Sequence, residues 1–196
     1  ILKKIKKEDP DILVCPGDFT VFGKNLNKIM SNFLVGKPFV FIPGNHEDGE
    51  KSVYLFAKNP EALLVHQTGI VVRGILFVGS GGGIYGRNEP TLDISKRLLA
   101  QKIKNFKKDN PKGKVVFITH RPAYGTKCDF MTEIQEYVGA TNITEFIKKN
   151  PIDLHIRGHI HECFNTRDKI GDTITVNPGP EGTIININNK VTVARK

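Results

Sequence analysis

The chain has 196 residues, which suits one domain with a sizeable core, and its hydrophobic share of 39% and charged share of 25% are ordinary for a globular protein. No apolar run approaches the length of about 18 residues that a membrane span needs, and no signal-peptide pattern opens the sequence. The cysteines are scattered without metal-type spacing, which favours reduced thiols in a cytoplasmic protein: Cys15, Cys128 and Cys163. We therefore expect a single cytoplasmic domain over residues 1–196, with no membrane segment.

The formal net charge is +9 at pH 7, and most of the positive charge comes from lysine. A basic surface attracts phosphate groups, so nucleic acid or another anionic substrate is one interpretation. The other is a lysine-rich solvated surface. The spread of the lysines over several segments, without interleaved aromatic residues, favours the second interpretation.

The chain opens with Ile1–Lys7, a pattern that indicates the last turns of an amphipathic helix already under way, so we expect further sequence before it. Near-continuous apolar runs then predict buried strands at Ile12–Val14, Phe39–Ile42, Ile75–Val78, Val115–Ile118 and Ile152–Ile156. Helical patterns lie between several of them, at Asn25–Leu34, Asp93–Lys108 and Glu133–Lys149. From Cys163 onward, short runs joined by tight turns predict antiparallel strands, and the whole pattern is typical of an α/β fold.

Polar residues with oxygen or imidazole donors directly follow four of these strands. In α/β sheets, ligands bind beyond the carboxyl ends of the strands, so we expect these side chains to converge on one edge of one sheet. They are Asp18, Asn45 and His46, His120, and the pair His159 and His161. A glycine stands directly before Asp18, Asn45 and His159, where it permits the sharp turn that aims the next side chain into the crevice.

This set of donors suits divalent transition metals such as Mn, Fe, Ni or Zn. The carboxylate of Asp18 can bridge two ions, and His159 and His161, one residue apart, can each face a different ion. Two ions about 3.5–4 Å apart can clamp a phosphoryl group and lower the pKa of a shared water. His46 follows Asn45 directly and is placed to protonate a leaving alkoxide, for which its ordinary pKa of about 6.5 is suitable.

Four short motifs resemble the later blocks of the calcineurin-like metallophosphoesterase superfamily, and the likeness covers most of the chain. They are Gly17-Asp18, Gly44-Asn45-His46-Glu47, Thr119-His120 and Gly158-His159-Ile160-His161. The segments 120–126, 137–139, 158–162 and 177–179 are similar to its small prokaryotic, Icc-related branch. The resemblance implies a two-sheet mixed β-sandwich flanked by helices. It also implies that Asp18 bridges two metals, that Asn45, His120 and His159 complete one site, that His161 serves the other, and that His46 donates a proton.

One block of the family is absent from the printed sequence. The family's Asp-x-His motif ends its first strand and would precede the helix at Ile1–Lys7, so an N-terminal strand and part of the first helix are expected to be missing. Those two ligands belong to the metal that His161 serves. The resemblance therefore implies that this second site lacks two of its ligands in the present chain.

The leading hypothesis is hydrolysis of a small phosphomonoester or phosphodiester by metal-bound hydroxide at a di-metal site. A nuclease is a second hypothesis, which the positive charge favours. A third is a non-catalytic scaffold. A scaffold would not need to retain all five of the histidine and asparagine side chains of the site, which are Asn45, His46, His120, His159 and His161. Arg121, beside His120, is a candidate for contacting a substrate phosphate, with a surface ion pair as the alternative. For His66 and His155 a structural role is favoured over a role as metal ligands.

Overall fold

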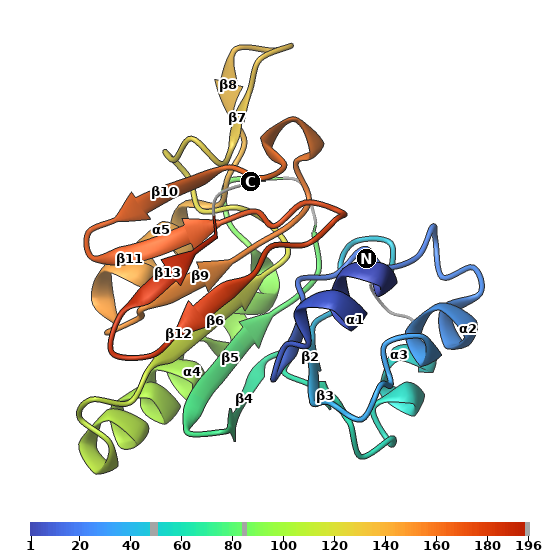
Figure 1. Cartoon of the computed structure of the whole chain (residues 1–196). Helices are drawn as coiled ribbons and strands as arrows, with labels where there is room; N and C mark the ends of the chain where they lie inside the picture. The colour runs from blue at the N-terminus through green and yellow to red at the C-terminus, as the bar shows by residue number, and fades with distance from the viewer. Residues whose placement is uncertain (48–50, 84–85, 195–196) are drawn as a thin grey trace.

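The computed structural model describes residues 1–47, 51–83 and 86–194 (Figure 1). Its helices are α1 (Leu2–Glu8), α2 (Leu26–Ser31), α3 (Lys51–Phe56), α4 (Pro90–Asp109) and α5 (Thr141–Lys149), with a 3₁₀ turn η1 (His161–Cys163). Its first strands are β1 (Leu13–Cys15), β2 (Phe39–Phe41), β3 (Ala62–Leu64), β4 (Thr68–Val72), β5 (Ile75–Ser80) and β6 (Val115–Thr119). The later strands are β7 (Phe130–Met131), β8 (Glu136–Tyr137), β9 (Leu154–Ile156), β10 (Arg167–Ile170), β11 (Thr173–Val176), β12 (Ile185–Ile187) and β13 (Val191–Val193).

Two sheets form the centre of the molecule. A three-stranded sheet has the order β1-β2-β3, and all its pairs are parallel. A six-stranded mixed sheet has the order β10-β11-β9-β6-β5-β4, in which the outer pairs β10-β11 and β4-β5 are antiparallel and the inner pairs are parallel. The hairpin β12-β13 lies against the six-stranded sheet, and the hairpin β7-β8 projects from one end of the molecule (Figure 1).

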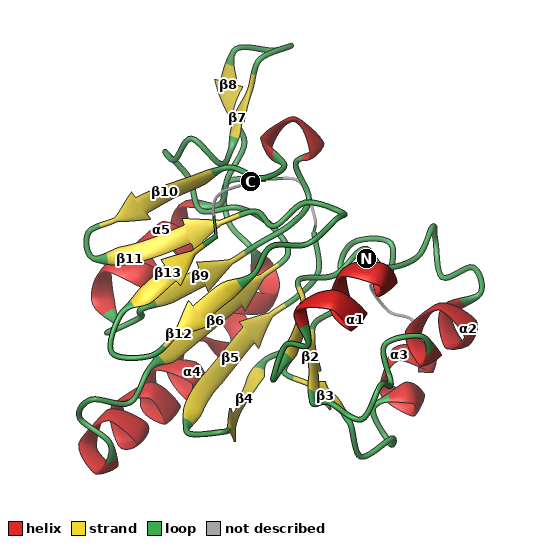
Figure 2. Ribbon diagram, in the orientation of Figure 1, coloured by secondary structure: helices red, strands yellow, loops and turns green. Residues whose placement is uncertain are grey.

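Apolar residues fill three layers of contact between these elements. The faces of the two sheets pack together through residues such as Val40 and Ile42 on one side and Phe77, Val116 and Ile156 on the other. Helices α4 and α5 cover the outer face of the six-stranded sheet, and α2 and α3 cover that of the three-stranded sheet (Figure 2). The architecture is therefore a two-sheet sandwich flanked by helices, as the resemblance implied.

Three of the expected strands, β2, β6 and β9, are buried on both faces, which is the environment that favours continuous β-branched and aromatic runs. All five residues of β6 are buried, for example. Helix α4 begins where Pro90 occupies the first turn and the side chain of Glu89 accepts a hydrogen bond from the backbone N–H of Thr91. No helix in the described ranges is long and apolar enough to cross a bilayer.

Two expectations from the sequence are wrong. The four site-bearing strands do not belong to one sheet, because β1 and β2 lie in the three-stranded sheet whereas β6 and β9 lie in the six-stranded one. The helix expected at Glu133–Lys149 begins only at Thr141, and its first part contains β8, the second strand of the hairpin β7-β8, instead. The buried carboxylate of Asp129 accepts hydrogen bonds from the backbone N–H groups of Gly125 and Gly139, which holds the base of this hairpin in a non-helical path.

Candidate metal centre

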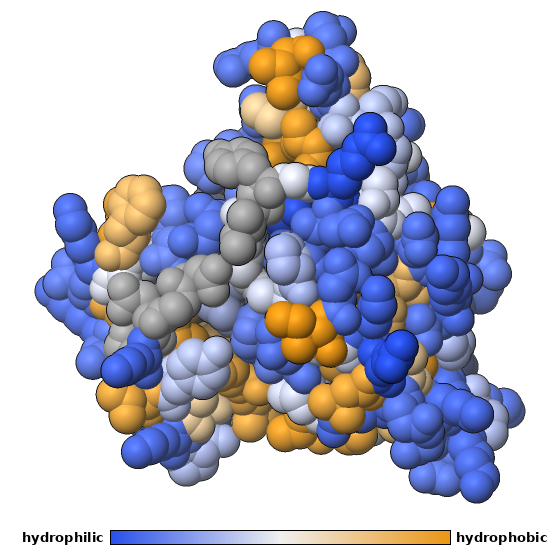
Figure 3. Space-filling view, turned by 180° about the vertical axis from the view of Figure 1, so that it is seen from behind, coloured by the Kyte–Doolittle hydropathy of each residue, from blue (hydrophilic) through white to orange (hydrophobic). Residues whose placement is uncertain are grey.

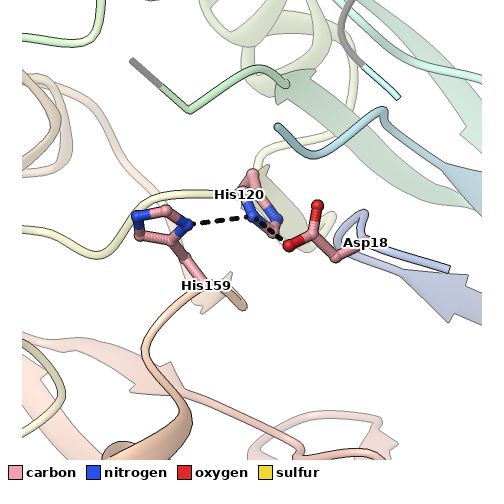
Figure 4. A group of neighbouring side chains, drawn as sticks. All are labelled: Asp18, His120 and His159. Atoms are coloured by element: carbon pink, nitrogen blue, oxygen red, sulfur yellow. Dashed lines mark hydrogen bonds and ion pairs between the residues drawn. The ribbon is translucent and has the colours of Figure 1, made fainter. Parts of the chain in front are cut away.

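The two sheets meet at the loops that follow β1, β2, β6 and β9, and each loop supplies one side chain to a common cluster. Asp18 and Asn45 come from the three-stranded sheet, and His120 and His159 come from the six-stranded sheet. Figure 3 shows the hydropathy of the molecular surface on the side opposite to the view of Figure 1. Figure 4 shows Asp18, His120 and His159 approaching one another from separate segments of the chain. Their ligand atoms all lie within 4.8 Å of one another, close enough to share one ion.

Asn45 Oδ1 lies at the centre of this cluster. It is 2.9 Å from His120 Nε2 and 2.9 Å from His159 Nδ1, and the two ring nitrogens are 3.2 Å apart. His120 Nε2 is also 3.1 Å from Asp18 Oδ2. The structure therefore brings together four of the six predicted site residues around one point.

The proton positions on His120 show what this cluster is suited to hold. Its Nδ1 lies 2.8 Å from the carbonyl oxygen of Pro16, which can only accept, so Nδ1 carries a hydrogen and Nε2 is the nitrogen that faces the cluster. Asp18 Oδ2 and Asn45 Oδ1 face the same point. A metal ion can take the place of the hydrogen on Nε2, and this oxygen and imidazole set suits a divalent transition metal. The residues present fit a metal ion.

The buried carboxylate of Glu47 ties two of the ligand loops together. Its Oε2 accepts hydrogen bonds from the backbone N–H groups of Asp18 at 2.8 Å and Gly44 at 3.1 Å, and its Oε1 accepts one from the N–H of Thr20 at 2.9 Å. Only 1% of Glu47 is exposed. Sequence reasoning quoted Glu47 within its motif but gave it no role, because its partners belong to a loop almost thirty positions earlier in the chain.

The backbone is strained or tightly approached at several points of the centre. Asp18 and His159 adopt positive φ values of 53° and 69°, which side chains rarely take and which cost about 1–3 kcal/mol each. A Cβ on Gly83 would lie 2.9 Å from Asn45 Cβ and 3.2 Å from His120 Cδ2. The glycine-rich loop after β5 therefore forms one wall of the cluster, and no side chain fits at that position.

The electrostatics of the ligands reflect this crowding. Burial on its own raises the pKa of Asp18, but the hydrogen bond and charge of His120, together with the backbone N–H of His46 at 3.0 Å, outweigh burial and lower it. Burial, followed by the repulsion of His120, lowers the pKa of His159 to about 4. Asp18 is thus an anion and His159 a neutral imidazole at neutral pH, which are the states in which both bind metal.

The remaining two predicted site residues flank the cluster. His46 is partly buried and its Nδ1 lies 3.0 Å from the carbonyl oxygen of Thr20. His161 is exposed at the start of η1, where its ring packs against Phe164 with 4.8 Å between centroids. His161 is not part of the three-residue group with Asp18. Its role as a ligand of a second ion stays a prediction, as do the roles of the other site residues.

The other candidates from the sequence have structural partners. Arg121 is neither on the surface nor directed at the cluster: it is 3% exposed and donates hydrogen bonds to the backbone carbonyls of Gly86, Asn88 and Val138. His66 Nδ1 lies 3.0 Å from the backbone N–H of Gly81. His155 is fully buried between the hydroxyls of Thr119 and Thr175.

The family model for calcineurin-like phosphoesterases matches residues 1–163, and the chain belongs to this family. Its members hydrolyse phosphate esters with divalent metals, and the cluster at Asp18 is a group of side chains that could hold a metal ion.

The chain is also similar to individual known proteins. The chain is 30% identical, over 193 residues, to the uncharacterized protein MJ1162 of Methanocaldococcus jannaschii, a match that covers 91% of this chain and 82% of the relative. The structure of TT1561 of Thermus thermophilus is similar with a TM-score of 0.64 and 17% identity, covering 98% of this chain and 89% of that one. The phosphopantetheinyl hydrolase PptH of Mycobacterium tuberculosis is similar with a TM-score of 0.53 and 13% identity, covering 86% of this chain and 78% of that one. At such low identities the two structures support the fold alone.

Proposed function

We propose that this protein hydrolyses a small phosphomonoester or phosphodiester with two divalent ions, drawn from Mn, Fe, Ni and Zn. The observation that carries the proposal is the cluster of oxygen and imidazole ligand atoms around Asn45 Oδ1, in which Asp18 Oδ2 and His120 Nε2 face one another at 3.1 Å. Ligands of these types suit a divalent cation. Family membership gives the chemistry that such an ion serves.

The proposal divides the work among the site residues. Asn45, His120 and His159 hold one ion, His161 contributes to the other, and the carboxylate of Asp18 bridges the two. When bound, the ions lower the pKa of water and neutralise the charge of the phosphoryl oxygens. The backbone N–H of His46, which donates to Asp18 Oδ1 at 3.0 Å, and the carbonyl of Pro16, which accepts from His120, keep these two ligands oriented.

His46 is suited to the role of proton donor because its two nitrogens differ. Nδ1 faces the carbonyl oxygen of Thr20 at 3.0 Å, and a carbonyl can only accept, so Nδ1 carries a hydrogen whether the ring is charged or neutral. Nε2 is then the nitrogen that gains and loses the proton. A hydrogen on Nε2 can be given to the leaving oxygen of the ester as the bond to phosphorus breaks.

Assays with added Mn²⁺ test the proposal and separate it from its rivals. The substrates are p-nitrophenyl phosphate, its bis-ester and single-stranded nucleic acid. Hydrolysis of either nitrophenyl ester that is lost on chelation and restored by Mn²⁺ supports the proposal. Cleavage of nucleic acid alone favours a nuclease, a function with which the net charge of +9 is consistent because nucleic acid is anionic. No hydrolysis of any substrate by protein that holds metal favours a binding scaffold.

A further inference from the structure

Phe22 places a large apolar ring in solvent beside the proposed proton donor. The residue is 71% exposed, and its ring stacks on the imidazole of His46 with 4.5 Å between centroids and 28° between planes. An exposed phenylalanine on its own is ordinary on a protein surface. Here, however, the ring lies on the leaving-group side of the centre, because it contacts the residue that protonates that group in the proposed function.

The backbone conformation at Phe22 is one that phenylalanine rarely adopts. The N–H of Lys24 donates to the carbonyl of Val21 at 3.2 Å, which closes a turn with Phe22 and Gly23 at its centre. Both central residues have positive φ, 50° and 71°, as in a type I′ turn. Asparagine followed by glycine is the preferred pair for such a turn, and an aromatic residue with positive φ is an outlier. Neither burial nor backbone preference explains the phenylalanine.

The turn that carries Phe22 is anchored to the metal centre. The hydroxyl of Thr20 accepts a hydrogen bond from the N–H of Gly23 at 3.1 Å, and Thr20 itself is bonded to the buried carboxylate of Glu47. Glu47 is the group that also holds the loops of Asp18 and Asn45. The backbone of this turn is therefore tied to the ligand loops, and the ring of Phe22 reaches His46 from it.

From this juxtaposition we infer that Phe22 is a specificity-determining residue, whose exposed ring stacks on a planar aromatic ring in the leaving group of the ester. The inference rests on the proposed function, since it takes His46 to mark the side on which the leaving group departs. An aromatic ring carries an electron-rich face and a positive edge, and offset stacking of two such rings gains more than the burial of an aliphatic group of equal size. A substrate of this class binds with its phosphoryl group at the ions and its ring against Phe22.

The test compares two esters that leave as similar primary alkoxides but differ in the flatness of the ring. Benzyl phosphate and cyclohexylmethyl phosphate, together with their methyl diesters, are measured with the Mn²⁺-loaded full chain, both for hydrolysis and for binding by calorimetry. We expect the benzyl compounds to be preferred by about three- to tenfold in kcat/KM and in Kd. Phe22→Asn should remove the preference, and because asparagine suits the turn it should also keep or raise the melting temperature.

Val21→Ala is the matched control, because Val21 is 60% exposed in the same turn but does not stack on His46. It should keep the preference for the benzyl compounds. Equal binding of the two ring types by the wild type would overturn the inference. So would a Phe22→Asn variant that keeps the preference, or one that weakens both ring types equally, since Phe22 would then only support His46. Absence of all hydrolysis contradicts the proposed function instead, and the binding ratio still decides the role of Phe22.

Discussion

The three-stranded and six-stranded sheets each supply two residues to the metal centre, but they are stabilised in different ways. The six-stranded sheet is covered by α4, a helix of 20 residues with five of them buried, and its strand β6 is buried throughout. The strands of the three-stranded sheet are three residues long, and α2 and α3 have six residues each. Helix α1, all of it within the described part of the chain, has no buried residue.

The difference indicates that the six-stranded sheet is the rigid scaffold and that local cross-links hold the other half of the site. Elements with little buried apolar surface open at lower free energy than the core of a protein. On the three-stranded side, the stacked rings of Phe33, Phe39 and Phe41 supply packing, and Glu47 ties the two ligand loops together. A metal ion that binds residues from both sheets would add a link between the halves, and it would stabilise the folded state by mass action.

Replacing Glu47 should have the largest effect, because Glu47 cross-links the two ligand loops of the three-stranded sheet, the less buried half of the site. Glu47→Ala leaves the N–H groups of Asp18, Gly44 and Thr20 without their acceptor, at about 1–3 kcal/mol for each of the two buried groups, Gly44 and Thr20. We expect a loss of several kcal/mol in the free energy of unfolding and a strong loss of metal affinity, measured by denaturant unfolding and calorimetry. Glu61→Ala is the matched control, since Glu61 accepts a hydrogen bond from the N–H of Gly36 in the same half but at an exposed site. Equal effects of the two changes would contradict the special role of Glu47.

Asp18→Asn removes the negative charge that faces both halves of the site while keeping the shape of the side chain. Loss of even an outer partner of a ligand typically lowers metal affinity 10–100-fold, so loss of the proposed bridging carboxylate should lower it more than about 100-fold. Turnover should fall further than in any single histidine variant. Elemental analysis and calorimetry measure the bound metal. A variant that retains two ions per chain would show that Asp18 does not bridge them.

His46→Ala tests the proposed proton transfer without removing a proposed metal ligand. The variant should keep its metal content, because the contacts at Asn45 and the two histidines remain, but turnover should fall about 10²–10⁴-fold. The loss should be greatest for esters with poor leaving groups, which depend on protonation. Steady-state kinetics with alkyl and nitrophenyl esters check this, and unchanged turnover of the alkyl ester would reject His46 as the proton donor.

The last of these predictions concerns the scaffold half, through His155, and its effect is small near neutral pH. Burial, with the nearby charge of Arg157, lowers its pKa from 6.5 to about 3 in the folded protein. Between these values the unfolded chain binds a proton that the folded chain does not, so the stabilising contribution is complete above pH 6.5 and is lost as the pH falls towards 3. The slope should be up to about 1.4 kcal/mol per pH unit. Urea unfolding of wild type and His155→Gln at several pH values tests this, and equal slopes would show that His155 is not responsible.

Much of the scaffold could be predicted from the sequence because its signals are local. The runs at Phe39–Phe41 and Val115–Thr119 are almost continuously apolar, which indicates buried strands even when the neighbouring strands are not known. The order of the polar residues after those strands likewise indicated that six side chains converge. The structure brings four of them together, namely Asp18, Asn45, His120 and His159.

What could not be predicted depends on contacts between distant segments. The resemblance implied two sheets, but which strands belong to which sheet is set by pairings such as β2 with β3, which no local pattern encodes. The hairpin before Thr141 follows from the hydrogen bonds of Asp129 to Gly125 and Gly139. The role of Glu47 and the stacking of Phe22 on His46 are both visible only once the loops after β1 and β2 lie side by side.

Hydrogen exchange of the metal-free and Mn²⁺-loaded protein, followed by mass spectrometry, tests most directly whether an ion links the two halves. Mn²⁺ should slow exchange in the loops after β1 and β2, over residues 16–20 and 43–47, and to a smaller extent throughout the three-stranded sheet, with little change in β5 and β6. Asp18→Asn should abolish this protection. Exchange that is unaffected by Mn²⁺, or that slows only within the six-stranded sheet, would contradict a metal centre shared between the sheets.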